Sequence, residues 1–223
     1  MSEEQSNLAN GATQFFNTLN KAGIDYRLAA TTQDGRTCTT LRTLTDGKTN
    51  FIDKNTVNAE AEWKKLSTPG TSGSSTETGF YCIREANLTG FDRTNAKNLV
   101  VFLSDEPENE TVLGSRPSGA STNYTIRSFN DYNDYFVKTG ATYFSIVGTG
   151  TLLRPNFTST RPDDPNYYCN GQGGSASGGA HFKEISRLTG GSSASICTDA
   201  ASWSVVFDEI IKSASGLASS FTL

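Results

Sequence analysis

An acidic pair follows the most apolar stretch of the chain. Residues 99–103 (LVVFL) contain no polar residue, and Ser104, Asp105 and Glu106 come directly after them. A continuous apolar run of this length is typical of a strand that is covered on both faces, as in the parallel sheet of an α/β domain. Ligands of such sheets bind just beyond the carboxyl ends of the strands. Asp105 is therefore a candidate ligand of a hard cation or a polar molecule; the alternative is that it caps a turn.

Other side chains that could do chemistry have simpler explanations. Glu77 is expected to be a charge in the first turn of a helix. The single histidine, His181, opens a helix beside a glycine-rich loop and is expected to be a surface cap rather than a catalytic base. Asp163 and Asp164 fall in a long loop, where a solvated turn is the simpler interpretation and contact with Ca²⁺ the alternative. No Ser–His–Asp set can be assembled, so we expect no catalytic residues and no enzyme.

The composition limits the class of protein. A chain of 223 residues fits one α/β domain with a core of its own. The net charge of −4 argues against a nucleic-acid binder, and the absence of any run of eighteen apolar residues argues against a membrane span. Four cysteines without a CxxC pair exclude a zinc cluster and favour two disulfides in an oxidising compartment. Because the chain shows no signal peptide, we expect part of the N-terminus to be missing.

The pattern of elements is that of an α/β domain. We expect helices at 2–20, 58–66, 77–88, 129–137, 181–188 and 203–214, and strands at 25–32, 37–44, 48–52, 99–103, 142–147 and 194–197. The turn Asp46-Gly47 predicts a hairpin between the second and third strands. Long loops at 106–125 and 152–179 are expected at a binding face. Alternating strands and helices predict a mostly parallel sheet with helices on both faces.

Five segments, in this order, resemble those of a von Willebrand factor type A domain. They are 22–29 (AGIDYRLA), 70–74 (GTSGS) with 77–79 (ETG), 99–106 (LVVFLSDE), 144–148 (FSIVG) and 188–191 (LTGG). Residues 91–93, 95–96, 104–106 and 195–197 further resemble secreted bacterial members of the family. The resemblance spans nearly the whole chain, 1–223, and implies a Rossmann-like, three-layer fold.

The resemblance also implies a metal-ion-dependent adhesion site. In the family, three loops supply an Asp-x-Ser-x-Ser motif, a threonine and an aspartate, and Asp105 matches that aspartate. Thr71 matches the threonine, with Ser74 as the rival in the same loop. Mg²⁺, for which Ca²⁺ or Mn²⁺ could substitute, takes octahedral oxygen ligands and keeps open positions that an acidic partner residue can complete.

The first metal loop of the family has no counterpart in this sequence. No Asp-x-Ser-x-Ser occurs, and residues 1–4 (MSEE) resemble those that follow the motif in the family. We therefore expect the first strand and first loop to be absent, with a natural variant as the alternative, and expect weak Mg²⁺ binding. In the family that strand lies between the segments matched by 26–30 and 99–103. Its loss predicts a chain that aggregates, dimerises or melts early.

The resemblance suggests which cysteines pair. It places a cysteine in each of the segments around Cys169 and Cys197, and the long loop at 152–179 needs an anchor, so we expect that disulfide. Cys38–Cys82 is then the second pair, although Cys82 could instead be a buried thiol.

The function expected from the resemblance is a non-enzymatic binding or adhesion module. It would be extracellular, on the cell surface or in the periplasm, and would recognise a protein or surface ligand through the loops at the carboxyl ends of the strands. One alternative is a scaffold domain that organises an enzyme, pilus or secretion assembly. Another is a structural module without metal.

Overall fold

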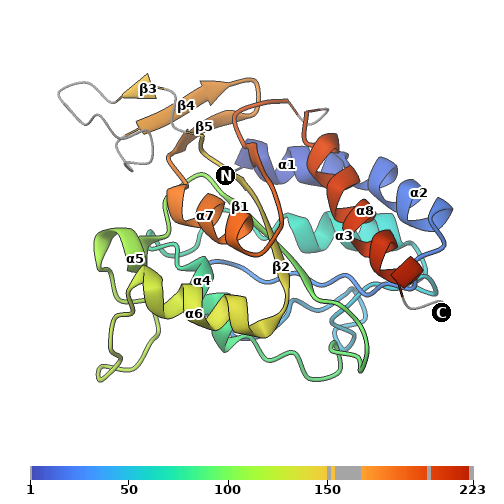
Figure 1. The fold of residues 1–223 in the computed structure, drawn as a ribbon, viewed down its shortest axis with the longest axis horizontal. Coiled ribbons are helices and arrows are strands. Elements are labelled where there is room, and N and C mark those ends of the chain that lie inside the picture. Colours follow the sequence, from blue (N-terminus) through green and yellow to red (C-terminus); the bar gives the residue numbers. More distant parts are fainter. Residues whose placement is uncertain (1, 150–151, 154–166, 200–201, 221–223) are drawn as a thin grey trace.

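The computed structural model describes residues 2–149, 152–153, 167–199 and 202–220, and shows an α/β fold, as predicted (Figure 1). The helices are α1 (Ser2–Asn10), α2 (Ala12–Lys21), α3 (Ala59–Ser67), α4 (Gly79–Glu85), α5 (Asn109–Leu113), α6 (Phe129–Thr139), α7 (Ala180–Leu188) and α8 (Ser204–Ser220). The strands are β1 (Leu99–Ser104), β2 (Thr142–Val147), β3 (Leu152–Leu153), β4 (Tyr167–Gly171), β5 (Gly174–Ser177) and β6 (Ser193–Ser195).

The central sheet is parallel, with the order β1-β2-β6. The register of β1 on β2 runs from Leu99 opposite Thr142 to Ser104 opposite Val147, which confirms that these two apolar runs are adjacent parallel strands. All six residues of β2 are buried. β1 differs, because the side chain of Val101 at its centre is 39% exposed. The prediction that β1 is covered on both faces is therefore wrong at this point, because Val101 belongs to neither of the apolar clusters that cover the sheet. In the part of the chain described, β1 also pairs on one edge only.

Apolar clusters cover the two faces of this sheet. On one face, Phe102 and Tyr143 pack with residues of α4, α6 and α7, and Phe80 of α4 stands among their rings. On the other face, Phe144 and Ile146 pack with residues of β6 and α8 and with both cysteines of one disulfide. Figure 1 shows α4–α7 grouped on one side of the molecule and α1, α2, α3 and α8 on the other. Successive side chains of β1 and β2 thus point to opposite faces of the sheet and enter opposite layers, as in any β-strand.

A third cluster gathers α2, α3 and α8 around residues 24–52. The predicted strands 25–32, 37–44 and 48–52 are not formed as such: Leu28 and Ile52 make one isolated antiparallel bridge. The turn at Asp46-Gly47 is present, since the carboxylate of Asp46 accepts the backbone N–H groups of Lys48 and Thr49 at 2.9 Å each. The flanks share one backbone hydrogen bond, from the N–H of Leu44 to the carbonyl of Thr49 at 2.7 Å, and do not pair further as strands; Leu44 and Ile52 pack with the helices of the third cluster.

A small antiparallel sheet, β3-β4-β5, occupies part of the predicted loop 152–179. It packs closely on the central sheet: a Cβ added to Gly148, just after β2, would lie 1.8 Å from the carbonyl oxygen of Ser177. Both predicted disulfides are present, Cys169–Cys197 at the base of this sheet and Cys38–Cys82 beside α4. Two disulfides are typical of secreted and extracellular proteins.

Several helices depart from their predicted bounds. The helix predicted at 2–20 is two helices, because Gly11 interrupts it between α1 and α2. The short helix α5 lies in the predicted polar loop 106–125, and α4 begins two residues later than predicted, at Gly79. Among the described residues, no helix combines the length and apolar character that a bilayer crossing requires.

Candidate functional site

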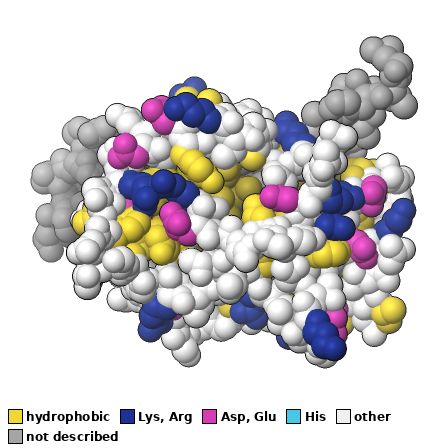
Figure 2. Space-filling view, turned by 90° about the horizontal axis from the view of Figure 1, so that it is seen from below, with side chains coloured by type: hydrophobic (Ala, Val, Ile, Leu, Met, Phe, Trp, Pro, Cys, Tyr) yellow, Lys and Arg dark blue, Asp and Glu magenta, His cyan; other side chains and the backbone are white. Residues whose placement is uncertain are grey.

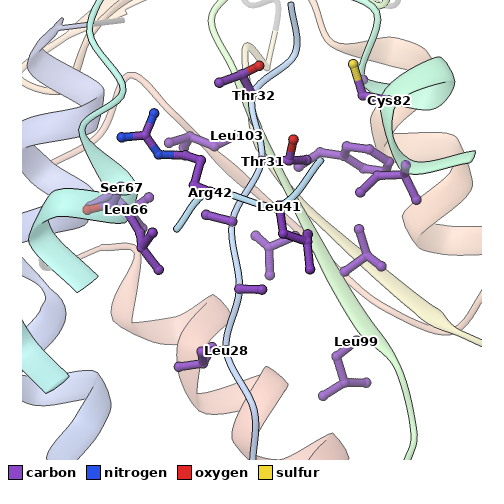
Figure 3. Close-up of a pocket in the computed structure, with 18 of the residues that line it drawn as sticks. Leu28, Thr31, Thr32, Leu41, Arg42, Leu66, Ser67, Cys82, Leu99 and Leu103 are labelled. Carbon is purple, nitrogen blue, oxygen red and sulfur yellow. The ribbon is translucent and has the colours of Figure 1, made fainter. Parts of the chain in front are cut away.

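A cavity of about 2080 Å³ lies between residues 26–32 and β1. Figure 3 shows Leu28 on one wall and Leu99 on the other. Side chains of α2 and α8 line one face of the cavity, and side chains of α4 line the other; they include Phe15, Leu19, Phe207, Ile210, Cys82 and Ile83. On the face of the molecule shown in Figure 2, apolar side chains are visible in a hollow with basic and acidic side chains around it.

An acidic group lines this cavity where β1 ends. Asp105 and Glu106 follow β1, and Glu77 approaches them from the segment before α4. The hydroxyl of Ser104 donates to Glu77 Oε2 at 2.6 Å. Burial raises the pKa of Glu77 to about 7; the hydrogen bond from Ser104 opposes this, and the charges of Asp105 and Glu106 add to it. Glu77 is therefore a proton-exchanging group near neutral pH, not the first-turn helix charge that we predicted.

The hydroxyl-rich loop 68–75 lines the same cavity. Thr71 is exposed to solvent, whereas Ser74 is held within the structure. The backbone N–H of Ser74 donates to Asp34 Oδ2 at 2.9 Å, and its hydroxyl lies 2.6 Å from that of Ser118. The hydrogen bond from Arg36 lowers the pKa of Asp34 to about 2, so this anchor stays charged. Of the two hydroxyls considered as metal ligands, that of Thr71 is the more accessible.

These residues do not complete a metal site. Within the described residues, no three carboxylate, imidazole or thiol side chains come together in a way that could hold a cation. Asp105 and Glu77 are two oxygen donors of the kind that Mg²⁺ takes, and Thr71 is a third, neutral one on the same cavity. A raised pKa at Glu77 means that this carboxyl group carries only part of a negative charge near neutral pH. The predicted Asp163 and Asp164 lie outside the described residues.

His181 has partners that the sequence did not reveal. Its Nδ1 lies 2.7 Å from the hydroxyl of Thr111, and its ring packs on Phe129 with centroids 4.4 Å apart. The same hydroxyl lies 2.9 Å from Glu108 Oε2. The hydroxyl thus stands between acid and imidazole, whereas a catalytic triad needs the imidazole in the middle. His181 is a side chain that joins α7 to α5 rather than the surface cap that we predicted.

The sequence predicted Asp105 and either Thr71 or Ser74 as ligands of one metal ion. All three residues line the cavity, and their role as ligands stays a prediction. Sequence reasoning missed Glu77 as a member of this group, and the only local sign was its position just after the hydroxyl-rich loop. It also missed Ser104, whose hydroxyl orients Glu77.

Comparison of the chain with protein-family models, with curated proteins and with solved structures finds no match. The similarity to von Willebrand factor type A domains therefore stays a prediction, and the function is argued from the site.

Proposed function

We propose that this chain is a non-enzymatic binding domain, and that it recognises a protein or surface ligand through the loops at the carboxyl end of β1. The observation that carries the proposal is that Asp105, Glu77 and Thr71 line one cavity, with Glu77 hydrogen-bonded to Ser104 at the end of β1. An exposed hydroxyl and half-buried carboxylates that line a cavity can contact a polar ligand directly or through a divalent cation. Two disulfides support an extracellular setting.

A cation would be held weakly by these residues. Asp105 supplies the charge, Thr71 a neutral oxygen and Glu77 a carboxyl group that is half protonated near pH 7. We expect a dissociation constant for Mg²⁺ on the order of 10⁻³ M or weaker, at the weak end of extracellular cation sites. When bound, the ion would present open positions to an acidic group of the partner.

Titration of the ¹⁵N-labelled chain with Mg²⁺ alone tests the proposal. Amide shifts should change at Thr71, Glu77 and Asp105, and Asp105→Asn should abolish the change. Val57→Thr, at an exposed position before α3 that does not line the cavity, serves as the matched control and should behave as the parent does. Shifts that persist in Asp105→Asn, or that occur away from these loops, would refute the proposed site; micromolar affinity would show that other carboxylates complete it.

A further inference from the structure

The edge of β1 that faces the cavity carries backbone groups without a strand partner. The carbonyl of Asn98 accepts from the N–H of Thr142 at 3.1 Å, which sets the alternation of the parallel ladder. Residues 98, 100, 102 and 104 therefore bond to β2, and Leu99, Val101 and Leu103 direct their backbone groups to the other side. There, the carbonyl of Leu103 accepts from the side-chain amide of Gln33.

The opposite wall shows the complementary arrangement. Leu28 exchanges two backbone hydrogen bonds with Ile52, each 2.7 Å long, and the carbonyl of Ala30 accepts from Arg42 at 2.8 Å. Since backbone groups alternate along an extended segment, Arg27 and Ala29 direct theirs away from these partners. Two rows of peptide groups thus border the cavity, and both walls contribute lining residues along its length.

Side chains, not backbone, span the gap between the two walls. At one end, the guanidinium of Arg93 donates to Asp25 Oδ2 at 2.6 Å and to the Asp25 carbonyl at 2.8 Å. At the other end, the amide of Gln33 reaches Leu103. Among the described residues, no backbone hydrogen bond joins 26–32 to β1. Side chains therefore bridge the two walls near both ends, while Val101 in the middle of β1 is 39% exposed.

The size and lining of the cavity indicate what could fill it. Its volume of about 2080 Å³ is at least twice that of pockets for small molecules, which span roughly 300–1,000 Å³. Both faces are apolar, with Phe207 and Ile210 on one and Cys82 and Ile83 on the other. A strand between two such faces must be apolar at every position, because its alternate side chains enter both layers.

We propose that this cavity binds an extended apolar peptide of about six residues, which adds as a strand between residues 26–31 and β1. The length is that of β1, six residues, and the side chain of Gln33 must leave the carbonyl of Leu103 for the peptide to pair along all of it. Peptide groups on both walls supply affinity without regard to sequence, and the two apolar faces select the side chains. The proposal concerns the interior of the cavity and does not depend on the cation or ligand contacts of Asp105 and Thr71.

The test uses a fluorescein-labelled peptide of six alternating valines and isoleucines with a lysine pair at each end for solubility. Its control has the same side chains, with methyl groups on the amide nitrogens of three alternate residues along one edge. Fluorescence anisotropy should show saturable binding of the first peptide, and the methylated peptide should bind at least about tenfold more weakly, since it loses several hydrogen bonds. Hydrogen exchange should slow at the amides of Val101 and Ala29 when the first peptide binds.

Two substitutions at one position provide matched variants. Val101→Pro removes an N–H that faces the cavity and leaves the bonds to β2, which an edge position tolerates. Val101→Thr keeps the N–H and the shape of the side chain. The proline variant should lose peptide binding, and the threonine variant should keep it. Should the proline variant fail to fold, the two peptides compared on the parent chain decide the question alone.

Three results would overturn the proposal. One is equal affinity for the methylated and unmethylated peptides, and another is slowed exchange at amides away from Val101 and Ala29. The third is a dimer in which these amides are already protected without peptide, since the occupant would then be a second copy of the chain.

Discussion

Glu108 is expected to make the stability of this protein fall as the pH rises. It lies just before α5 with 0% of its surface exposed, and Oε2 accepts from the backbone N–H of Thr111 at 2.8 Å. Burial raises its pKa from 4.5 to about 7, and the hydrogen bonds from Thr111 oppose this only in part. The folded protein therefore retains a proton that the unfolded chain releases.

The sign and size of the effect follow from these two pKa values. The contribution of Glu108 is fully present below pH 4.5, where both states hold the proton. It is lost as the pH rises toward 7, because only the unfolded state then gains from ionisation. The free energy of unfolding should fall by about 2–3 kcal/mol between pH 5 and pH 8 on account of this residue. That is a sizeable part of the roughly 5–15 kcal/mol that stabilises a domain.

Urea unfolding of the parent and of Glu108→Gln at pH 5, 6, 7 and 8 measures the effect. Glutamine resembles the protonated acid and does not titrate. The free energy of unfolding of Glu108→Gln should therefore increase relative to that of the parent as the pH rises. Glu77 titrates in the same direction, and the comparison with the variant removes its contribution. Glu85→Gln, at an exposed position on α4, should keep the parent's slope. Parallel curves for the parent and Glu108→Gln would refute the reasoning.

Three further predictions concern packing. Replacing Cys169 and Cys197 together by serine removes a crosslink between residues 28 positions apart. The free energy of unfolding, measured in urea, should fall by roughly 3–4 kcal/mol, and a fall of less than 1 kcal/mol would contradict the chain-entropy argument. Phe80→Ala removes a fully buried ring and should lower the free energy of unfolding by about 3–5 kcal/mol. Val137→Ala, at a half-exposed position on α6, should lower it little in the same urea experiments. Gly148→Ala forces the new Cβ against the carbonyl of Ser177 and should abolish cooperative unfolding. Gly11→Ala should not, because its Cβ would lie 3.5 Å from the nearest atom. Cooperative unfolding of the Gly148→Ala variant would mean that β5 can move away.

The elements that could be predicted are those whose pattern is local. β2 is a continuous apolar run, and α6 has a serine cap at Ser128 and a left-handed Gly140 after its end, so both appear close to their predicted positions. The extended segment around Leu28 was predicted as a strand from alternation alone. It forms only an isolated bridge, because a strand is defined by its neighbours and one side of this segment is bordered by the cavity.

The contacts that define the site could be predicted only in part. Asp105 was placed from the end of an apolar strand, which is a local signal. The pairing of Ser104 with Glu77 joins residues 27 positions apart, and that of Thr111 with His181 joins residues 70 positions apart. Such contacts depend on how α4, α5 and α7 pack, and neither periodicity nor spacing encodes that packing. The sheet β3-β4-β5 was missed because its glycines and asparagines favour loops.

The disulfide Cys38–Cys82 is a covalent tie between two segments that lie 44 residues apart in the sequence. It ties the stretch that continues from one wall of the cavity to α4, which lines the neighbouring face. A covalent tie of this kind limits how far the two segments can separate, with a strength that an ion pair near the surface, such as that of Arg93, does not have. Both cysteines of this disulfide are buried, with 0% of Cys38 and 1% of Cys82 exposed, so a reductant in the surroundings does not reach this crosslink while the protein is folded. The position of this stretch against α4, once set in an oxidising compartment, therefore persists until the chain unfolds.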